Sequence, residues 1–214
     1  MPVTLINPFE VAADREAAFV EGWKQTAAVF AGKPGFLDTR LHRSLDPASR
    51  FRFVNVAHWS GAEAWAEAMR AFPPKEGGVA GIKANPALYA PMPGGSIEAN
   101  GPSVEGDGAF TQVVQFEVEP EKQGALIAAI AAEVERWVSR RPGFMSATLH
   151  ASSDGRRVVN YARWRTEADF AAFTRDPEGE RLSAAIRAVG PSSGPAAVGC
   201  RVVRSIRAPG GGDE

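Results

Sequence analysis

Two short segments of the chain carry an asparagine followed four positions later by a tryptophan. They are Asn55 and Trp59 in RFRFVNVAHW, and Asn160 and Trp164 in RRVVNYARW. Both segments alternate apolar and polar residues as a β-strand does, so the amide and the indole share one face, about 13 Å apart. An amide can donate a hydrogen bond to an oxygen atom, and an indole can stack on a ring or donate its N–H. The pattern therefore favours a site for a flat, polar-edged aromatic ligand.

The same alternation places Phe51 and Phe53 on the face of Asn55, where they would line such a site. Packing alone is the competing interpretation, because a tryptophan that ends a strand is commonly a core residue and a buried amide can satisfy a backbone group. Burying an amide without a partner costs about 1–3 kcal/mol, so packing alone gives little reason to place one in a strand. Both interpretations stay open on these residues alone.

His42 and His150 each end the first strand of a predicted hairpin. Because imidazole titrates near neutral pH, a histidine within reach of the ligand could remove a substrate proton. The alternative is a histidine exposed to solvent at the edge of a hairpin. The three histidines show no metal-ligand spacing, and no Gly-rich loop suits a phosphate. The sequence therefore predicts no metal, nicotinamide or flavin cofactor.

A second pair of similar segments indicates a tandem duplication. KPGFLDTRLH in the first half aligns with RPGFMSATLH in the second, and PFEV aligns with QFEV. The segment between the halves, PMPGGSIEANGPSVEGDG, is rich in glycine and proline, which is typical of a linker. We predict a first repeat over residues 1–93, a linker over 94–108, a second repeat over 109–207 and a flexible tail over 208–214.

Both halves have the same predicted order of elements. A strand opens each half, a helix follows, a hairpin carries the asparagine and the tryptophan, and a second helix and a last strand close it. This order predicts two tandem ferredoxin-like βαββαβ repeats of the α+β class, with the helices on one face of each sheet. The other face would expose apolar residues in an isolated repeat. We therefore expect the repeats to pack sheet-to-sheet as an intramolecular dimeric α/β barrel.

Composition and charge bear on the partners of the chain. Apolar residues make up 44% and charged residues 23% of its 214 residues, as in ordinary globular proteins. The 24 Lys and Arg residues nearly balance the 25 Asp and Glu residues, so neither nucleic acid nor a membrane surface is an expected partner. Cys200 stands alone, which excludes an internal disulfide. Because no leader or membrane-spanning pattern is found, we expect a soluble, cytoplasmic protein.

The pattern G-F-x-x-x-x-L-H, followed by a turn and F-V-N-V-A-x-W, resembles the antibiotic biosynthesis monooxygenase family of the dimeric α+β barrel superfamily. LDTRLHRSLDPASRFRFVNVAHW is especially similar to the central hairpin of that family. The resemblance implies a cofactor-independent monooxygenase that oxidises an anthrone- or phenol-like polycyclic aromatic of polyketide type to a quinone with O₂. Haem-degrading relatives carry an axial histidine on the second helix, and the corresponding segments here contain none.

The same resemblance implies roles for individual residues. The two asparagines would polarise a substrate oxygen, and the two tryptophans would bound the pocket and orient the ring. The family's additional arginine would correspond to Arg187 in the second repeat, while Lys83 is the nearest basic residue in the first.

Two other functions stay open. A polyketide cyclase or isomerase could use the same pocket to stabilise an enolate without O₂, and a non-catalytic barrel protein could bind a small molecule there. Pairing of the repeats within one chain also leaves further homodimer formation open.

Overall fold

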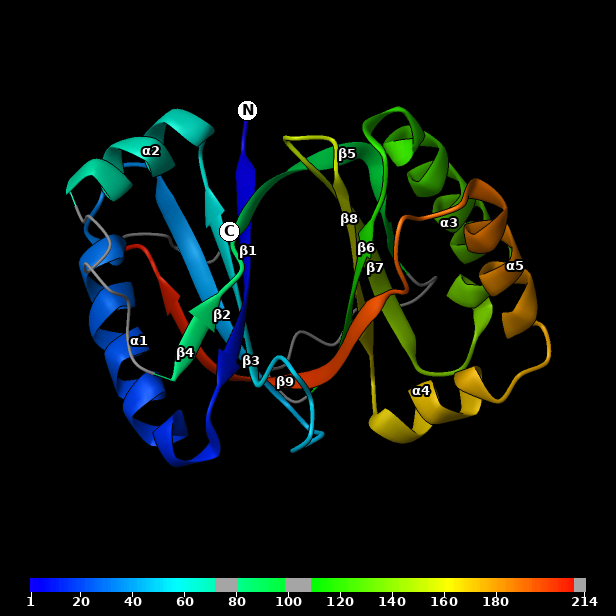
Figure 1. The fold of residues 1–214 in the computed structure, drawn as a ribbon, viewed down its shortest axis with the longest axis horizontal. Helices are drawn as coiled ribbons and strands as arrows, with labels where there is room; N and C mark the ends of the chain where they lie inside the picture. Colours follow the sequence, from blue (N-terminus) through cyan, green and yellow to red (C-terminus); the bar gives the residue numbers. More distant parts are fainter. Residues whose placement is uncertain (72–80, 99–108, 210–214) are drawn as a thin grey trace. The chain divides into compact units, whose positions relative to one another are not determined.

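The computed structural model describes residues 1–71, 81–98 and 109–209. The chain divides into two compact units. Unit 1 comprises Met1–Tyr89 and Val202–Glu214, and unit 2 comprises Ala90–Arg201. Each unit is built around one copy of the repeat (Figure 1).

Unit 1 follows the predicted order of elements. They are β1 (Val3–Val11), the 3₁₀ turn η1 (Ala13–Arg15), α1 (Glu16–Ala31), β2 (Phe36–Ser44), β3 (Phe53–Trp59), α2 (Ala62–Ala71), β4 (Ile82–Ala84) and the first residues of β5 (Ala87–Glu98). Strand β3 lies between β1 and β2 and pairs antiparallel with both. Helices α1 and α2 cover one face of these strands (Figure 1).

Unit 2 repeats this arrangement. Its elements are β6 (Phe110–Glu117), η2 (Pro120–Lys122), α3 (Gln123–Arg136), η3 (Val138–Arg140), β7 (Phe144–Ser152), β8 (Arg157–Trp164), α4 (Glu167–Thr174), α5 (Gly179–Val189) and the first part of β9 (Ala196–Arg207). Strand β8 lies between β6 and β7, as β3 does between its neighbours. Helix α5 follows α4 and packs on α3. The prediction of two tandem ferredoxin-like α+β repeats is confirmed.

The strand that closes each repeat belongs partly to each unit. In unit 1, Ala87–Tyr89 of β5 pair with β1, and the remainder of β5 is a neighbour of β7 in unit 2. Strand β9 begins beside β6 in unit 2 and continues from Val202 beside β2 in unit 1. The alternation of apolar and polar residues along one repeat does not indicate that β5 and β9 each belong to both units.

The predicted linker and tail are described only in part. Residues 94–98 of the predicted linker lie in β5, and residues 99–108 lie outside the described part of the chain. In the predicted tail, the Ala208 amide donates a hydrogen bond of 2.9 Å to the carbonyl of Leu37. Residues 210–214 lie outside the described residues.

The helix-facing core of unit 1 combines one row of α1 with alternate strand residues. Phe19, Trp23 and Ala27 recur every fourth residue and form the buried stripe of α1. They pack with Leu41 of β2 and Phe53 of β3, and the Phe19 and Phe53 rings lie 4.8 Å apart. Burying a large apolar side chain contributes about 1.5–3 kcal/mol, so this cluster fixes α1 on the sheet.

The backbone conformation at the start of each hairpin explains why the Pro-Gly-Phe motif contains a glycine. Gly35 and Gly143 both adopt φ of 80°, a left-handed conformation that a side chain disfavours. A Cβ atom on Gly35 would also lie 2.5 Å from Ala64 Cβ and from Ser60 Oγ. The Gly35 carbonyl accepts a hydrogen bond of 2.8 Å from the Ser60 amide, which ties the start of β2 to the end of β3.

This geometry predicts opposite effects of two Gly→Ala substitutions in unit 1. Gly35→Ala should lower the free energy of unfolding by about 1–3 kcal/mol, because it adds backbone strain and a clash. Gly22→Ala should raise it by roughly 0.5–1 kcal/mol, because Gly22 lies in an exposed part of α1 where an added Cβ meets nothing within 4 Å. Urea denaturation of both variants measures the difference, and equal effects would contradict the assigned conformation.

Candidate functional site

Asn55 lies in the middle of β3, on the face that the helices of unit 1 cover. It pairs with Leu41 on β2 and with Asn7 on β1, and directly opposite residues of an antiparallel pair share a face. Leu41 belongs to the core beneath α1, which gives the direction of that face. Asn55 is 9% exposed. The amide is therefore held inside the layer between sheet and helix.

Two donors fix the Asn55 side chain through its carbonyl oxygen. The Trp23 indole N–H donates a hydrogen bond of 2.9 Å to Asn55 Oδ1, and the Thr39 hydroxyl donates one of 2.7 Å to the same atom. Because an indole N–H can only donate, the atom that faces Trp23 must be the oxygen of the amide. The NH₂ group of the amide (Nδ2), called the amine below, is left as the group that can donate to a ligand.

The strip of β1 beside Asn55 is accessible on the same face. Four of the five helix-facing residues of β1 are partly exposed, namely Val3, Leu5, Asn7 and Phe9, while the fifth, Val11, is buried in the core beneath α1. Those of β3 are buried, so accessible surface begins directly alongside Asn55. Asn7 Oδ1 accepts a hydrogen bond of 3.0 Å from the Asn85 amide, which leaves the Asn7 amine as a second donor on this strip. The pairing of Asn7 with Asn55 was not predicted from the sequence.

Trp59 ends the same row of β3 and is 2% exposed. Its ring meets Phe36 and Phe30 edge-to-face, with centroids 5.2 and 5.8 Å away. Its Nε1 atom is buried and has no hydrogen-bond partner among the described residues. Trp59 is thus a core residue that also carries an unused donor, on the same face as Asn55.

In unit 2, Asn160 and Trp164 occupy the matching positions of β8 in a different environment. The Oδ1 atom of Asn160 is buried and has no donor among the described residues of the chain. Trp164 is 1% exposed, and its ring is surrounded by those of Phe144, Phe170 and Phe173 at 5.4, 5.7 and 4.8 Å. The two repeats keep the same pair of residues but not the same contacts.

The histidines lie on the other face of the sheet. His42 pairs with Val54, and His150 with Val159, so both side chains point away from the face of the asparagines. Both are buried, at 0% and 5% exposure, so the alternative of a solvent-exposed hairpin histidine is wrong. His42 Nδ1 lies 3.1 Å from the Val54 carbonyl oxygen. A role for either histidine in proton transfer stays a prediction that requires the substrate to reach that face.

The remaining predicted site residues are dispersed. Phe53 is a core residue of unit 1, in contact with Phe19. Phe51 is buried but precedes β3, which begins at Phe53, so the expected alternation does not extend to it. Arg187 lies on α5 with its side chain 62% exposed and ion-paired with Glu180. A role for Arg187 in substrate binding stays a prediction.

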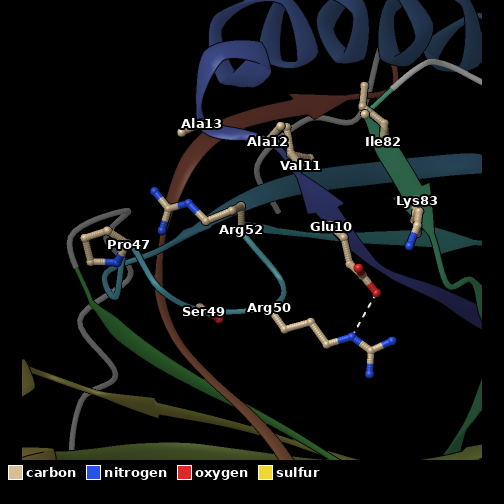
Figure 2. A pocket seen from close by; sticks show the side chains of 11 residues that line it. Glu10, Val11, Ala12, Ala13, Pro47, Ser49, Arg50, Arg52, Ile82 and Lys83 are labelled. Carbon is tan, nitrogen blue, oxygen red and sulfur yellow. Dashed lines mark hydrogen bonds and ion pairs between the residues drawn. The ribbon is translucent and has the colours of Figure 1, made fainter.

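A cavity of about 490 Å³ opens at the far end of β1, and its lining includes none of the predicted catalytic residues. Figure 2 shows charged side chains from three segments around it. Glu10 of β1 accepts a hydrogen bond of 2.8 Å from Arg50, and Lys83 of β4 lies nearby. Arg52 lies on the loop that precedes β3. This cavity could not be predicted from the sequence, because its lining residues follow no periodic pattern.

Arg52 is committed to structural contacts at this end of unit 1. It donates to Glu16 at 2.9 Å and to the Asp46 carbonyl at 2.6 Å. Burial acts to raise the pKa of Glu16, but the hydrogen bond and charge of Arg52, together with those of Arg43, lower that pKa below its ordinary value. Glu16 therefore stays ionised and holds the loop before β3 against the start of α1.

Groups of three or more metal-ligating side chains are not found in the part of the chain that the structure describes. Cys200 is fully buried, and its thiol donates to the Thr111 carbonyl at 3.4 Å. Burial raises the pKa of this thiol, which keeps it protonated and unreactive. None of the helices within the described ranges has the length and hydropathy that crossing a lipid bilayer requires.

A duplicated ferredoxin-like fold with an asparagine and a tryptophan on each central strand defines the class of protein. The family model described as antibiotic biosynthesis monooxygenase matches residues 2–71 and 109–184, once in each repeat. These matches cover more than half of the chain, and the chain therefore belongs to the antibiotic biosynthesis monooxygenase family. The resemblance expected from the hairpin motif is confirmed.

Individual relatives extend this result. Tetracenomycin-F1 monooxygenase of Streptomyces glaucescens is 52% identical over 68 residues, which cover 32% of this chain and 61% of that protein. The chain thus spans about three fifths of the length of this curated relative. The structure of an anthrone oxidase-like protein matches with a TM-score of 0.77 and 17% identity over 97% of this chain and 94% of that one. A ferredoxin-fold protein of Listeria monocytogenes related to antibiotic biosynthesis monooxygenases has a TM-score of 0.55 and 11% identity over 94% and 95% of the two chains. At these identities the two structural matches show the fold alone.

The contacts of two tryptophans predict different stability effects for the same substitution. Trp23→Phe removes a hydrogen bond to a buried carbonyl oxygen, whereas Trp59→Phe removes an N–H that has no partner among the described residues. Trp23→Phe should therefore lower the free energy of unfolding by about 0.5–1.5 kcal/mol more than Trp59→Phe does. Urea denaturation of both variants gives this difference, and the reverse order would contradict the assignment of the Asn55 amide.

Proposed function

We propose that the protein is a cofactor-independent monooxygenase that oxidises an anthrone- or phenol-like polycyclic aromatic substrate to a quinone with O₂. The observation that carries this proposal is the Asn55 amide, whose oxygen accepts two hydrogen bonds while its amine stays available beside an accessible strip of sheet. Membership of the antibiotic biosynthesis monooxygenase family supports the reaction class. The similarity to a tetracenomycin-F1 monooxygenase and to an anthrone oxidase-like protein supports the substrate class.

In the proposed reaction the protein stabilises the negative charge of the substrate anion, and the substrate itself passes the electron to O₂ without a bound cofactor. Loss of a proton from the ring methylene of an anthrone gives a delocalised anion with most of its charge on the oxygen. This anion passes one electron to O₂, and the resulting radical and superoxide combine into a peroxide at the former methylene carbon. After the peroxide takes up a proton, loss of water leaves the second quinone carbonyl. One O₂ is consumed, one oxygen atom enters the product and the other leaves as water.

Asn55 has the geometry to stabilise the anion in this sequence. Its amine would donate to the substrate oxygen on which charge develops, and the donors on Oδ1 hold the amide in place before the substrate arrives. A fixed donor needs no reorganisation when the proton leaves, so it lowers the pKa of the substrate and the barrier to electron transfer. The same donor therefore serves both the deprotonation and the oxidation step.

Trp59 would bound the other end of the bound ring system. It lies four residues from Asn55 on the same strand face, roughly 13 Å away, which is close to the length of a three-ring aromatic. Its buried Nε1 donor would satisfy a polar group at the far edge of the substrate. Two donors separated by the length of the substrate would orient it without any cofactor.

Oxygen uptake tests the proposed reaction directly. Protein treated with a chelator and free of flavin should consume O₂ with dithranol or emodin anthrone faster than the uncatalysed reaction and form one quinone for each O₂. Uptake at the uncatalysed rate with several anthrones would contradict the oxygenase. Rearrangement of such a substrate without O₂ uptake would identify the cyclase or isomerase instead.

Substitution of Asn55 tests the residue that carries the proposal. Asn55→Ala should lower kcat by about 10²–10³-fold, because it removes a donor to the developing oxyanion. Asn85→Ala is the control, since only the backbone amide of Asn85 takes part in the contact with Asn7. A kcat for Asn55→Ala within threefold of that of the control would contradict the assigned role.

A further inference from the structure

The neighbours of the two asparagines can be compared position by position. Trp23 and Ile130 are each the eighth residue of their helices, α1 and α3. Thr39 and Ala147 lie opposite Ala57 and Ala162 in the matching strand pairs. Asn7 and Val114 lie directly opposite the asparagine of their own unit. The pairs of equivalent positions are therefore Trp23 and Ile130, Thr39 and Ala147, and Asn7 and Val114.

In every one of these pairs the first repeat has a hydrogen-bonding side chain and the second an apolar one. Both donors to Asn55 Oδ1 are replaced, and Asn160 Oδ1 is accordingly without a donor among the described residues. Ile130 and Ala147 are each 1% exposed, so buried apolar side chains stand where the two donors stand in unit 1. Because no described residue donates to Asn160 Oδ1, the orientation of this amide is not set by a donor to its oxygen, as that of Asn55 is.

The accessible strip also differs between the units. Val3 at the start of the strip in β1 is partly exposed, whereas the matching residue of β6, Phe110, is 3% exposed and stacks on Phe170 at 5.0 Å. The aromatic cluster around Trp164 thus extends over the start of β6. The partly exposed helix-facing residues of β6 are Gln112 and Val114, which lie beside Asn160, while Phe110 and Phe116 on either side of them are buried. The accessible strip is therefore shorter in unit 2 than in unit 1.

We propose that the chain has one working centre, in the first repeat, and that Trp23 and Thr39 are the positioning residues that define it. They orient the Asn55 amide so that its amine meets the substrate oxygen, and they act through Asn55 rather than on the substrate. The second repeat keeps Asn160 and Trp164 but lacks these donors, and it serves the fold. The catalytic part of this inference rests on the proposed oxygenase function.

Variants of Thr39 test the positioning role. Thr39→Val keeps the shape of the side chain and removes the hydroxyl, so kcat should fall about tenfold with little change in KM. Thr39→Ser restores the hydroxyl and should keep kcat within threefold of the wild type. Thr4→Val, at another buried threonine of unit 1 that pairs with His58 and Tyr89 rather than with Asn55, is the matched control. A purely structural role for Thr39 would lower the melting temperature without changing kcat, which would overturn the proposal.

Ligand stoichiometry tests the single centre without relying on turnover. Titration calorimetry with 1,8-dihydroxyanthraquinone, the quinone formed from dithranol, should show one site per chain. Asn55→Ala and Thr39→Val should each raise the Kd of this site about tenfold. Asn160→Ala should raise the Kd by about twofold at most. Two equal sites per chain, or equal losses from Asn55→Ala and Asn160→Ala, would overturn the proposal. One site with these losses but no oxygen uptake would keep the single centre and reject the oxygenase.

Discussion

The carbonyl oxygen of Asn55 accepts two hydrogen bonds, one from the Trp23 indole and one from the Thr39 hydroxyl, inside the layer between sheet and helices. Because an unpaired amide in such a place is costly, these bonds explain how a polar residue is tolerated at the centre of an apolar strand. They also leave the amine as the free end of the side chain. Under the proposed function, stability and catalysis would depend on the same contacts, because the donors that stabilise Asn55 in the core would also direct its free end toward the substrate.

The duplication shows which features the fold requires and which the site requires. Both repeats keep the left-handed glycine before the hairpin, the central position of the asparagine strand and the aromatic packing around the tryptophan. The donors around the asparagine occur in one repeat alone. A sheet and its covering helices need apolar volume at those positions, which Ile130 and Ala147 supply. Only a site that must hold an amide in one orientation needs the indole and the hydroxyl.

Much of the fold could be predicted from the sequence, because its signals are local. Alternation in the hairpins, helical periodicity and the repeated Pro-Gly-Phe motif gave the order of elements in both repeats, and the face of Asn55 followed from strand geometry. The sharing of β5 and β9 between the units was not predicted, because pairing over long sequence separations leaves no local pattern. The burial of His42 was missed for a related reason, since the alternation gives a face but not what covers it.

The site was predicted less completely than the fold. The repeated asparagine and tryptophan identified the strand, but the partners of Asn55 lie 32 and 16 residues away along the chain and belong to no motif. Trp23, Thr39 and Asn7 were not predicted as site residues. Comparison with the equivalent positions of the second repeat could have pointed to these residues, because each of them is apolar there. A polar residue whose duplicate is apolar, next to a residue that both copies keep, is the pattern on which the proposal of a single working centre rests.

A crystal structure of the protein with bound 1,8-dihydroxyanthraquinone tests the central claim most directly. The account predicts a ligand oxygen about 2.7–3.2 Å from Asn55 Nδ2, on the helix-facing side of β3, with the ring system extending toward Trp59. A ligand held instead in the cavity beside Glu10 and Arg50, with no atom near the Asn55 amine, would contradict it.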